Sequence, residues 1–247
     1  MTIVKKQLKD VHCYGVDGCR GGWFFARACD QQVSCGAVVS LKDLLEKVPQ
    51  TSRVFVDIPI GLRDTDGAAR LCDQQARRLL SPLRTSSVFN PPLRVILAME
   101  DYAGANETSK RLSGKGLSKQ SFYITPKIRE VDQLIMASDT VRGMLREAHP
   151  EVCFYGLAGG NPMRHSKKTK EGFDERLKLL VKYQPGVENA VELAMSDYPR
   201  KIVAADDILD ALVCAVTARM KEWWVTVPQI PELDSKGIPM EMVYCKI

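Results

Sequence analysis

The sequence predicts an α/β protein built on a mixed sheet. Residues 12–16, 23–28 and 33–39 are predicted strands joined by short connections that contain Gly or Asp, which is typical of an antiparallel meander. A short amphipathic helix then leads to a fourth apolar strand at residues 53–56. A strand that returns through a helical crossover usually pairs in parallel, so we expect the fourth strand to lie beside the first.

The composition is that of an ordinary globular protein. Of the 247 residues, 45% are hydrophobic and 26% are charged, and no apolar run is long enough to cross a bilayer. The first ten residues carry lysines but lack the apolar core of a secretory signal. The eight cysteines include no Cys-x-x-Cys pair, so we expect reduced thiols and no zinc site. We therefore expect a cytoplasmic protein of one domain (1–247) that has no membrane partner.

A stretch near the C-terminal end carries the strongest chemical signal. Residues 208–218 are almost entirely apolar at helical spacing, which indicates a buried helix. Three carboxylates nevertheless lie in its first two turns, namely Asp206, Asp207 and Asp210. Either of the first two could cap the helix, but Asp210 lies too far inside it for that role. A buried carboxylate is costly unless it is paired or binds a cation, so Asp210 needs one or the other.

Acidic residues also follow three of the predicted strands. Asp17 follows the first strand, Asp57 follows the fourth, and Glu151 comes shortly after a strand predicted at residues 144–148. Each Asp alone is well explained as a turn residue. Because parallel strands bring their carboxyl ends to one edge of a sheet, we expect Asp17 and Asp57 to meet there. Several carboxylates gathered at one place need a counter-charge, and Mg²⁺ or Mn²⁺ fits oxygen ligands better than zinc does.

The remaining elements are predicted from helical or alternating spacing. Residues 64–80 are expected to form a helix on which Asp73 and Arg77 make a surface ion pair. Residues 92–140 are expected to be a helical insertion that covers the site. The other expected segments are a helix at 173–183, a weakly patterned connection at 185–201 and an edge strand at 238–244.

Basic and hydroxyl side chains gather in two segments. Residues 164–182 are rich in Lys and Arg, and residues 81–92 are rich in hydroxyl and guanidinium groups. Such groups suit phosphate, although a basic run is more often a solvated surface and a lone histidine is more often structural. The residues predicted to contact a substrate are Arg20, Arg84, Ser86, Ser87, Lys127, His149, Lys167 and Lys168.

A series of motifs, from about residue 15 to the last strand, resembles one known family. The motifs are GVDGCRGGW at residues 15–23, DIPIGL at 57–62, RLCD at 70–73, SSVF at 86–89, HPE at 149–151, SKKT at 166–169 and DDILDA at 206–211. In this order they are similar to a bacterial family of uncharacterised proteins described as predicted ribonuclease-H-like nucleases. The resemblance implies a mixed five-stranded sheet, three antiparallel strands followed by two parallel ones, with helices on both faces.

The resemblance also implies a set of acidic site residues. In the ribonuclease-H-like superfamily the first strand, the fourth strand and a late helix supply carboxylates. Asp17, Asp57 and Asp207 or Asp210 fall on those positions, and the helix resembles that of Holliday-junction resolvases. Glu151 lies outside this trio and is added to the predicted catalytic set.

We therefore expect a metal-dependent nuclease that acts on DNA or RNA. Two Mg²⁺ or Mn²⁺ ions roughly 4 Å apart would act on a phosphodiester bond. The aspartates expected to hold them are Asp17, Asp57, Asp207 and Asp210. Two other classes stay open. One is an actin-like or sugar-kinase-like ATP-binding phosphotransferase that uses the glycines after Asp17, although the chain is short for the duplicated halves of such kinases. The other is a non-catalytic nucleic-acid-binding module. The oligomeric state is also open, with a homodimer as one option.

Overall fold

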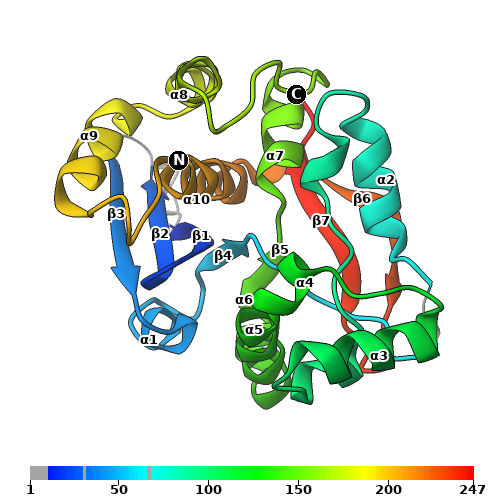
Figure 1. Cartoon of the computed structure of the whole chain (residues 1–247). Helices are drawn as coiled ribbons and strands as arrows, with labels where there is room; N and C mark the ends of the chain where they lie inside the picture. The colour runs from blue at the N-terminus through cyan, green and yellow to red at the C-terminus, as the bar shows by residue number, and fades with distance from the viewer. Residues whose placement is uncertain (1–10, 30–31, 66–67) are drawn as a thin grey trace, which may run out of the picture.

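The main sheet has five strands in the mixed arrangement that the sequence predicts. The computed structural model describes residues 11–29, 32–65 and 68–247. The strands are β1 (Cys13–Cys19), β2 (Gly22–Cys29), β3 (Gln32–Val38), β4 (Arg53–Val56) and β5 (Leu145–Glu147). Their order is β3-β2-β1-β4-β5 (Figure 1). β1, β2 and β3 pair antiparallel, whereas β4 runs parallel to β1 and β5 parallel to β4. This topology is consistent with a ribonuclease-H-like fold.

Helices cover both faces of this sheet. The helices are α1 (Leu41–Leu45), α2 (Leu71–Leu79), α3 (Tyr102–Ser113), α4 (Lys119–Tyr123), α5 (Thr125–Ala137), α6 (Asp139–Met144), α7 (Pro150–Leu157), α8 (Lys170–Tyr183), α9 (Val187–Asp197) and α10 (Ala205–Arg219), with 3-10 turns η1 (Thr85–Ser87), η2 (Arg94–Ala98) and η3 (Lys221–Trp223). α10 packs on β1, β2 and β4 and also contacts α7, α8 and α9 (Figure 1). α1 and α5 contribute to the core on the opposite face.

Alternating residues of the central strands enter two separate cores, because successive side chains of a strand point to opposite faces. Val54 and Val56 of β4 pack in the core that contains Leu41 of α1 and Ile128 of α5. Phe55, between them, belongs to the core that is formed largely by α10. The sheet is therefore covered on both sides, as a parallel sheet requires.

Two predicted boundaries and one predicted connection differ in the structure. β1 continues through Asp17 to Cys19, because these residues extend the antiparallel ladder with β2. The helix expected at 64–80 is confined to Leu71–Leu79, and residues 66–67 lie outside the described part of the chain. The connection at 185–201 contains α9, whose buried residues follow helical spacing. These residues are Val187, Ala190, Val191 and Ala194.

The edge strand predicted at 238–244 is present, and it lies outside the main sheet. That strand, β7 (Pro239–Cys245), pairs antiparallel with β6 (Trp224–Leu233) in a separate two-stranded sheet. β6 contains Pro228 and Pro231, and proline argues against a regular strand. The ladder accommodates them through a register shift between Val227 and Glu232.

The composition leads to expectations about membrane crossing, about a secretory signal and about the cysteines. Within the described ranges, no helix combines the length and the apolarity that a bilayer crossing requires. The expectation that residues 1–10 carry no secretory signal lies outside the described residues. All eight cysteines are free thiols, and six of them are buried.

Candidate metal centre

The register between β1 and β4 brings two aspartates together. Val16 and Val56 form the last parallel pair, and the backbone N–H of Asp57 donates to the Val16 carbonyl at 2.9 Å. Asp17 and Asp57 are the next residues, so both lie at the same edge of the sheet, as the sequence predicts. Asp17 is buried and Asp57 is half-buried.

The contact between α10 and Gly15 brings the third carboxylate to this edge. A Cβ atom on Gly15 would lie 2.0 Å from the Ala211 carbonyl oxygen and 2.2 Å from the Ala215 nitrogen, so only glycine allows this approach. Asp210 precedes Ala211 on the first turns of α10 and is buried. Ligand oxygens of Asp17, Asp57 and Asp210 all lie within 4.8 Å of one another. We call these three residues the aspartate cluster.

The aspartate cluster has the electrostatics of a cation site. Burial, followed by the Asp57 and Asp210 carboxylates, raises the pKa of Asp17 well above its ordinary value. Burial and the Asp210 carboxylate raise the pKa of Asp57 to about 7. Oδ1 of Asp210 is buried and has no hydrogen-bond partner in the described part of the chain. A divalent cation would provide both a partner for this oxygen and a counter-charge, so the residues fit such an ion.

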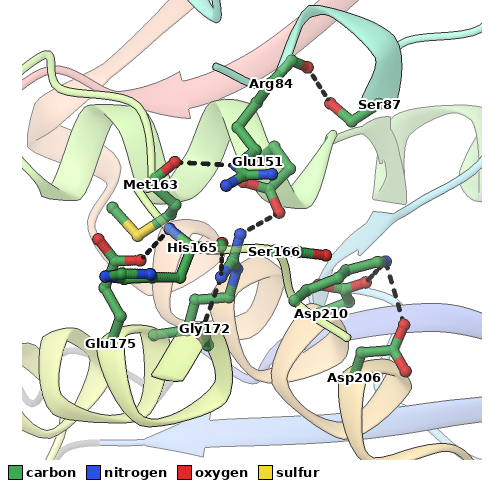
Figure 2. A network of polar contacts seen from close by, with 12 residues as sticks. Arg84, Ser87, Glu151, Met163, His165, Ser166, Gly172, Glu175, Asp206 and Asp210 are labelled. Atoms are coloured by element: carbon green, nitrogen blue, oxygen red, sulfur yellow. Dashed lines mark hydrogen bonds and ion pairs between the residues drawn. The ribbon is translucent and has the colours of Figure 1, made fainter. Parts of the chain in front are cut away.

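Two lysines lie beside the aspartate cluster. Lys167 Nζ donates to Oδ2 of Asp210 and lies 3.4 Å from Oδ2 of Asp206 (Figure 2). Lys168 Nζ donates to the same Asp206 oxygen at 2.6 Å. Burial alone would lower the pKa of Lys167, but the facing Asp210 and Asp17 carboxylates raise it above its ordinary value. Both lysines therefore contact acids of α10, and their role in substrate binding stays a prediction.

Asp207 and Glu151, the other predicted acids, have partners of their own. Asp207 Oδ2 accepts a hydrogen bond from the Ala204 N–H at 2.8 Å and so caps α10. It is not a member of the aspartate cluster. Glu151 Oε1 accepts from Arg176 Nη2 at 2.6 Å, and its buried Oε2 has no partner in the described ranges. Glu151 also contributes to the raised pKa of Asp57.

Three of the predicted substrate residues are engaged in holding loops together. Arg84 donates to the backbone carbonyls of Met163 at 2.8 Å and Arg164 at 2.6 Å. Ser87 Oγ donates to the Arg84 carbonyl at 2.7 Å. Nε2 of His149 lies 3.2 Å from the Ser87 carbonyl oxygen, and burial lowers the pKa of this histidine.

The other three predicted substrate residues differ in exposure. Lys127 donates to the Gly22 carbonyl and lies 4.4 Å from the centre of the Trp23 ring. Arg20 and Ser86 are exposed. Of the eight predicted substrate residues, the structure brings Lys167 and Lys168 into contact with the acids of α10.

The prediction that Asp73 and Arg77 form a surface ion pair is wrong, because Asp73 belongs to a buried network of ion pairs next to the site. Asp73 faces inward and accepts from Arg70 Nη2 at 2.6 Å. Arg77 donates instead to the Val88 carbonyl. Arg70 also donates to Glu147, the last residue of β5, at 2.8 Å. Helical spacing places Asp73 and Arg77 one turn apart but does not reveal that this face is buried, and no sequence pattern marks Glu147.

A cavity of about 400 Å³ lies beside this network. Arg70, Arg77 and Lys115 are among the residues that line it, which gives its wall a positive charge. A smaller pocket of about 20 Å³ shares Arg70 and Asp73 with this cavity and extends to Asp57 and His149. The two pockets therefore share part of their walls, and the smaller one reaches Asp57 of the aspartate cluster.

The fold and the site define a class, namely α/β proteins with a buried aspartate cluster that can hold a metal ion at the edge of a mixed sheet. Residues 15–232 match the family described as Protein of unknown function (DUF429), and the chain belongs to that family. Neither the curated proteins nor the solved structures include a match to the chain.

Proposed function

We propose that the protein is a metal-dependent nuclease of the ribonuclease-H-like superfamily. The observation that carries the proposal is the convergence of Asp17, Asp57 and Asp210, with the buried Oδ1 of Asp210 having no hydrogen-bond partner among the described residues. These three residues would hold Mg²⁺ or Mn²⁺, with Asp207 and Glu151 supporting them from just outside. When bound, such an ion supplies positive charge to the attacking water and to the leaving oxygen of a phosphodiester.

Hydrolysis adds the elements of water across a P–O bond. The water oxygen bonds to phosphorus, the bond from phosphorus to one sugar oxygen breaks, and that oxygen takes up a proton. The products are a phosphate monoester and a free hydroxyl group. The chain's contribution is to orient and desolvate the reacting groups: Asp17 and Asp210 are buried away from bulk water, and Lys167 and Lys168 place positive charge beside them.

A nucleic-acid partner is supported by the distribution of positive charge around the site. Lys168 is exposed next to the acidic helix, and Arg77 and Lys115 line the cavity that shares Arg70 and Asp73 with the small pocket at Asp57. Basic side chains in such positions bind the phosphate backbone and fix its register without reading the bases. We therefore infer that a strand of DNA or RNA passes this cavity on its way to the aspartate cluster.

The test compares wild type with Asp17→Asn and Asp210→Asn on single-stranded, double-stranded and branched DNA and on RNA. With Mg²⁺ or Mn²⁺, each variant should lose ~100-fold or more of the cleavage rate, since changes outside the ligand sphere already cost up to that much. Asp174→Asn is the matched control, because Asp174 is exposed on α8 and pairs with Lys170. Equal rates in wild type and the cluster variants would overturn the proposal.

The two alternative classes have outcomes of their own in this test. Of the glycines expected to cradle a phosphate, Gly21 is exposed and Gly18 and Gly22 are half-buried. A thermal shift with ATP and Mg²⁺, without one for nucleic acid, would favour a phosphotransferase. Binding of nucleic acid without any binding of Mg²⁺ or Mn²⁺ would favour a non-catalytic module.

A further inference from the structure

The two oxygens of Asp210 have different surroundings. Oδ2 accepts a hydrogen bond from the ammonium group of Lys167, while the buried Oδ1 has no partner in the ranges that the structure describes. A carboxylate that bridges two cations directs one oxygen to each. At Asp210 the place beside Oδ2 is taken by the side chain of Lys167.

The loop before Lys167 is fixed on several sides, so the position of this lysine is built into the fold. Arg84 of the 81–92 loop donates to the carbonyl of Met163 at 2.8 Å (Figure 2) and to that of Arg164 at 2.6 Å. Glu175 of α8 accepts from the N–H groups of Arg164 and His165 at 2.9 and 3.0 Å. These contacts anchor both the backbone carbonyl groups and the backbone N–H groups of the loop.

α8 holds the same loop through a buried arginine and a glycine. Arg176 Nη1 donates to the carbonyls of His165 at 3.1 Å and Gly172 at 2.8 Å, while its Nη2 is bound to Glu151 (Figure 2). A Cβ atom on Gly172 would lie 1.9 Å from the Ser166 carbonyl oxygen, so the backbone just before Lys167 rests directly on the helix.

The charges around Asp210 fit one divalent ion. The three carboxylates of the aspartate cluster face the ammonium group of Lys167, while Asp206, outside the cluster, is paired with Lys168. Asp207 is left out of this comparison because its carboxylate caps α10. Two negative charges remain, and one divalent ion neutralises them, whereas a second ion would add two positive charges in a buried place.

We propose that the ammonium group of Lys167 takes the place of a second divalent ion, so that the site binds one ion at Asp17, Asp57 and Oδ1 of Asp210. The inference rests on the metal centre of the proposed function and replaces the two-ion arrangement expected from the sequence. Lys167 is a positioning residue: it holds Asp210 and keeps a positive charge at the place that a two-ion site gives to its second ion.

The test measures the stoichiometry of Mn²⁺ binding to the full chain by calorimetry, together with the electron paramagnetic resonance spectrum. Wild type should bind one Mn²⁺ per chain and give the signal of an isolated ion. Two ions per chain, or the spectrum of a spin-coupled pair, would overturn the inference and leave the metal centre in place. No binding at all would overturn the metal centre itself.

Lysine variants test the same point independently. Lys167→Met keeps the length of the side chain but removes its charge, and it should raise the stoichiometry from one ion to two. Lys168→Met is the matched control, because Lys168 is exposed and contacts Asp206 outside the aspartate cluster, and it should still bind one ion. A Lys167→Met protein that binds one ion would contradict the inference. If this variant does not fold, the wild-type stoichiometry decides.

Discussion

Asp57 is a carboxyl group whose surroundings favour its protonated form. Burial, with the neighbouring Asp210 carboxylate, raises its pKa from 3.8 to about 7. Because the pKa is higher in the folded state than in the unfolded state, the contribution of Asp57 to stability is fully present below about pH 4. It is lost as the pH rises to about 7. In the absence of a cation, ionised Asp57 therefore destabilises the folded protein.

Asp57→Asn should make the metal-free protein more stable at pH 8, because the amide is neutral at every pH. We expect the free energy of unfolding to rise by about 1–4 kcal/mol at pH 8 and by less at pH 5, measured by urea unfolding in the presence of a chelator. The exposed Asp174→Asn should change neither value. An Asp57→Asn protein less stable than wild type at pH 8 would show that the Asp57 carboxylate is not under electrostatic strain.

At the scale of elements, the site depends on how closely α10 approaches β1. The Gly15 contact leaves no room for a side chain, and it positions the turn of α10 that carries Asp210. Gly15→Ala should therefore force the helix away from the sheet. We expect a loss of about 1–3 kcal/mol in the free energy of unfolding, the usual cost of overpacking, together with weaker Mn²⁺ binding.

Gly143→Ala is the matched control for this change. Gly143 lies in α6, and a Cβ atom there would meet nothing within 4 Å. Alanine should be neutral or stabilise the protein by about 0.4–1 kcal/mol. If Gly15→Ala retained both wild-type stability and wild-type Mn²⁺ affinity, the close helix–strand contact would not be what positions the site.

The Arg70 network joins three further elements. Arg70 bonds Asp73 of α2 and Glu147 of β5, and Glu147 also accepts from the Ile60 N–H after β4 at 2.6 Å. Removing one partner of a buried ion pair leaves an uncompensated charge. Arg70→Met should therefore lower the free energy of unfolding by about 3–5 kcal/mol.

The Arg70 prediction is checked by urea unfolding against two reference variants. Arg78→Met, on the exposed face of the same helix, should cost little. The double variant Arg70→Met/Glu147→Gln should recover part of the loss, because it removes the charge left behind at Glu147. A double variant that is no more stable than Arg70→Met would contradict this explanation.

At the scale of the whole molecule, much of the sheet could be predicted from local patterns. The pairing of the first four strands could be predicted from the short connections that contain Gly or Asp and from one helical crossover. The convergence of Asp17 and Asp57 followed from that pairing. Asp210 was identified because a carboxylate inside an apolar helix needs a partner, either a positively charged side chain or a metal ion.

The features that could not be predicted depend on contacts between distant segments. Helical spacing identified Asp207 as a possible cap but left both Asp207 and Asp210 as candidate metal ligands, and only the Gly15 contact and the hydrogen bond from the Ala204 N–H to Asp207 distinguish them. The partner of Glu147 lies 77 residues away, and β6 contains prolines that argue against a strand. Such features require the folded arrangement, since no local periodicity encodes them.

The positively charged cavity makes a prediction about nucleic-acid binding. Lys115→Glu should weaken binding to DNA or RNA of different sequences alike, and it should lower the salt dependence of the affinity by about one ion. Lys236→Glu, an exposed lysine between β6 and β7, serves as the control and should have a smaller effect. An unchanged salt dependence in Lys115→Glu would show that nucleic acid does not pass this cavity.

The most direct measurement is the anomalous difference density of a crystal soaked in Mn²⁺. The account predicts a peak at the sheet edge, within coordination distance of Asp17, Asp57 and Asp210, and no such peak in Asp210→Asn. A well-ordered aspartate cluster that shows no peak in millimolar Mn²⁺, with its carboxylates neutralised by Lys167 alone, would contradict the account.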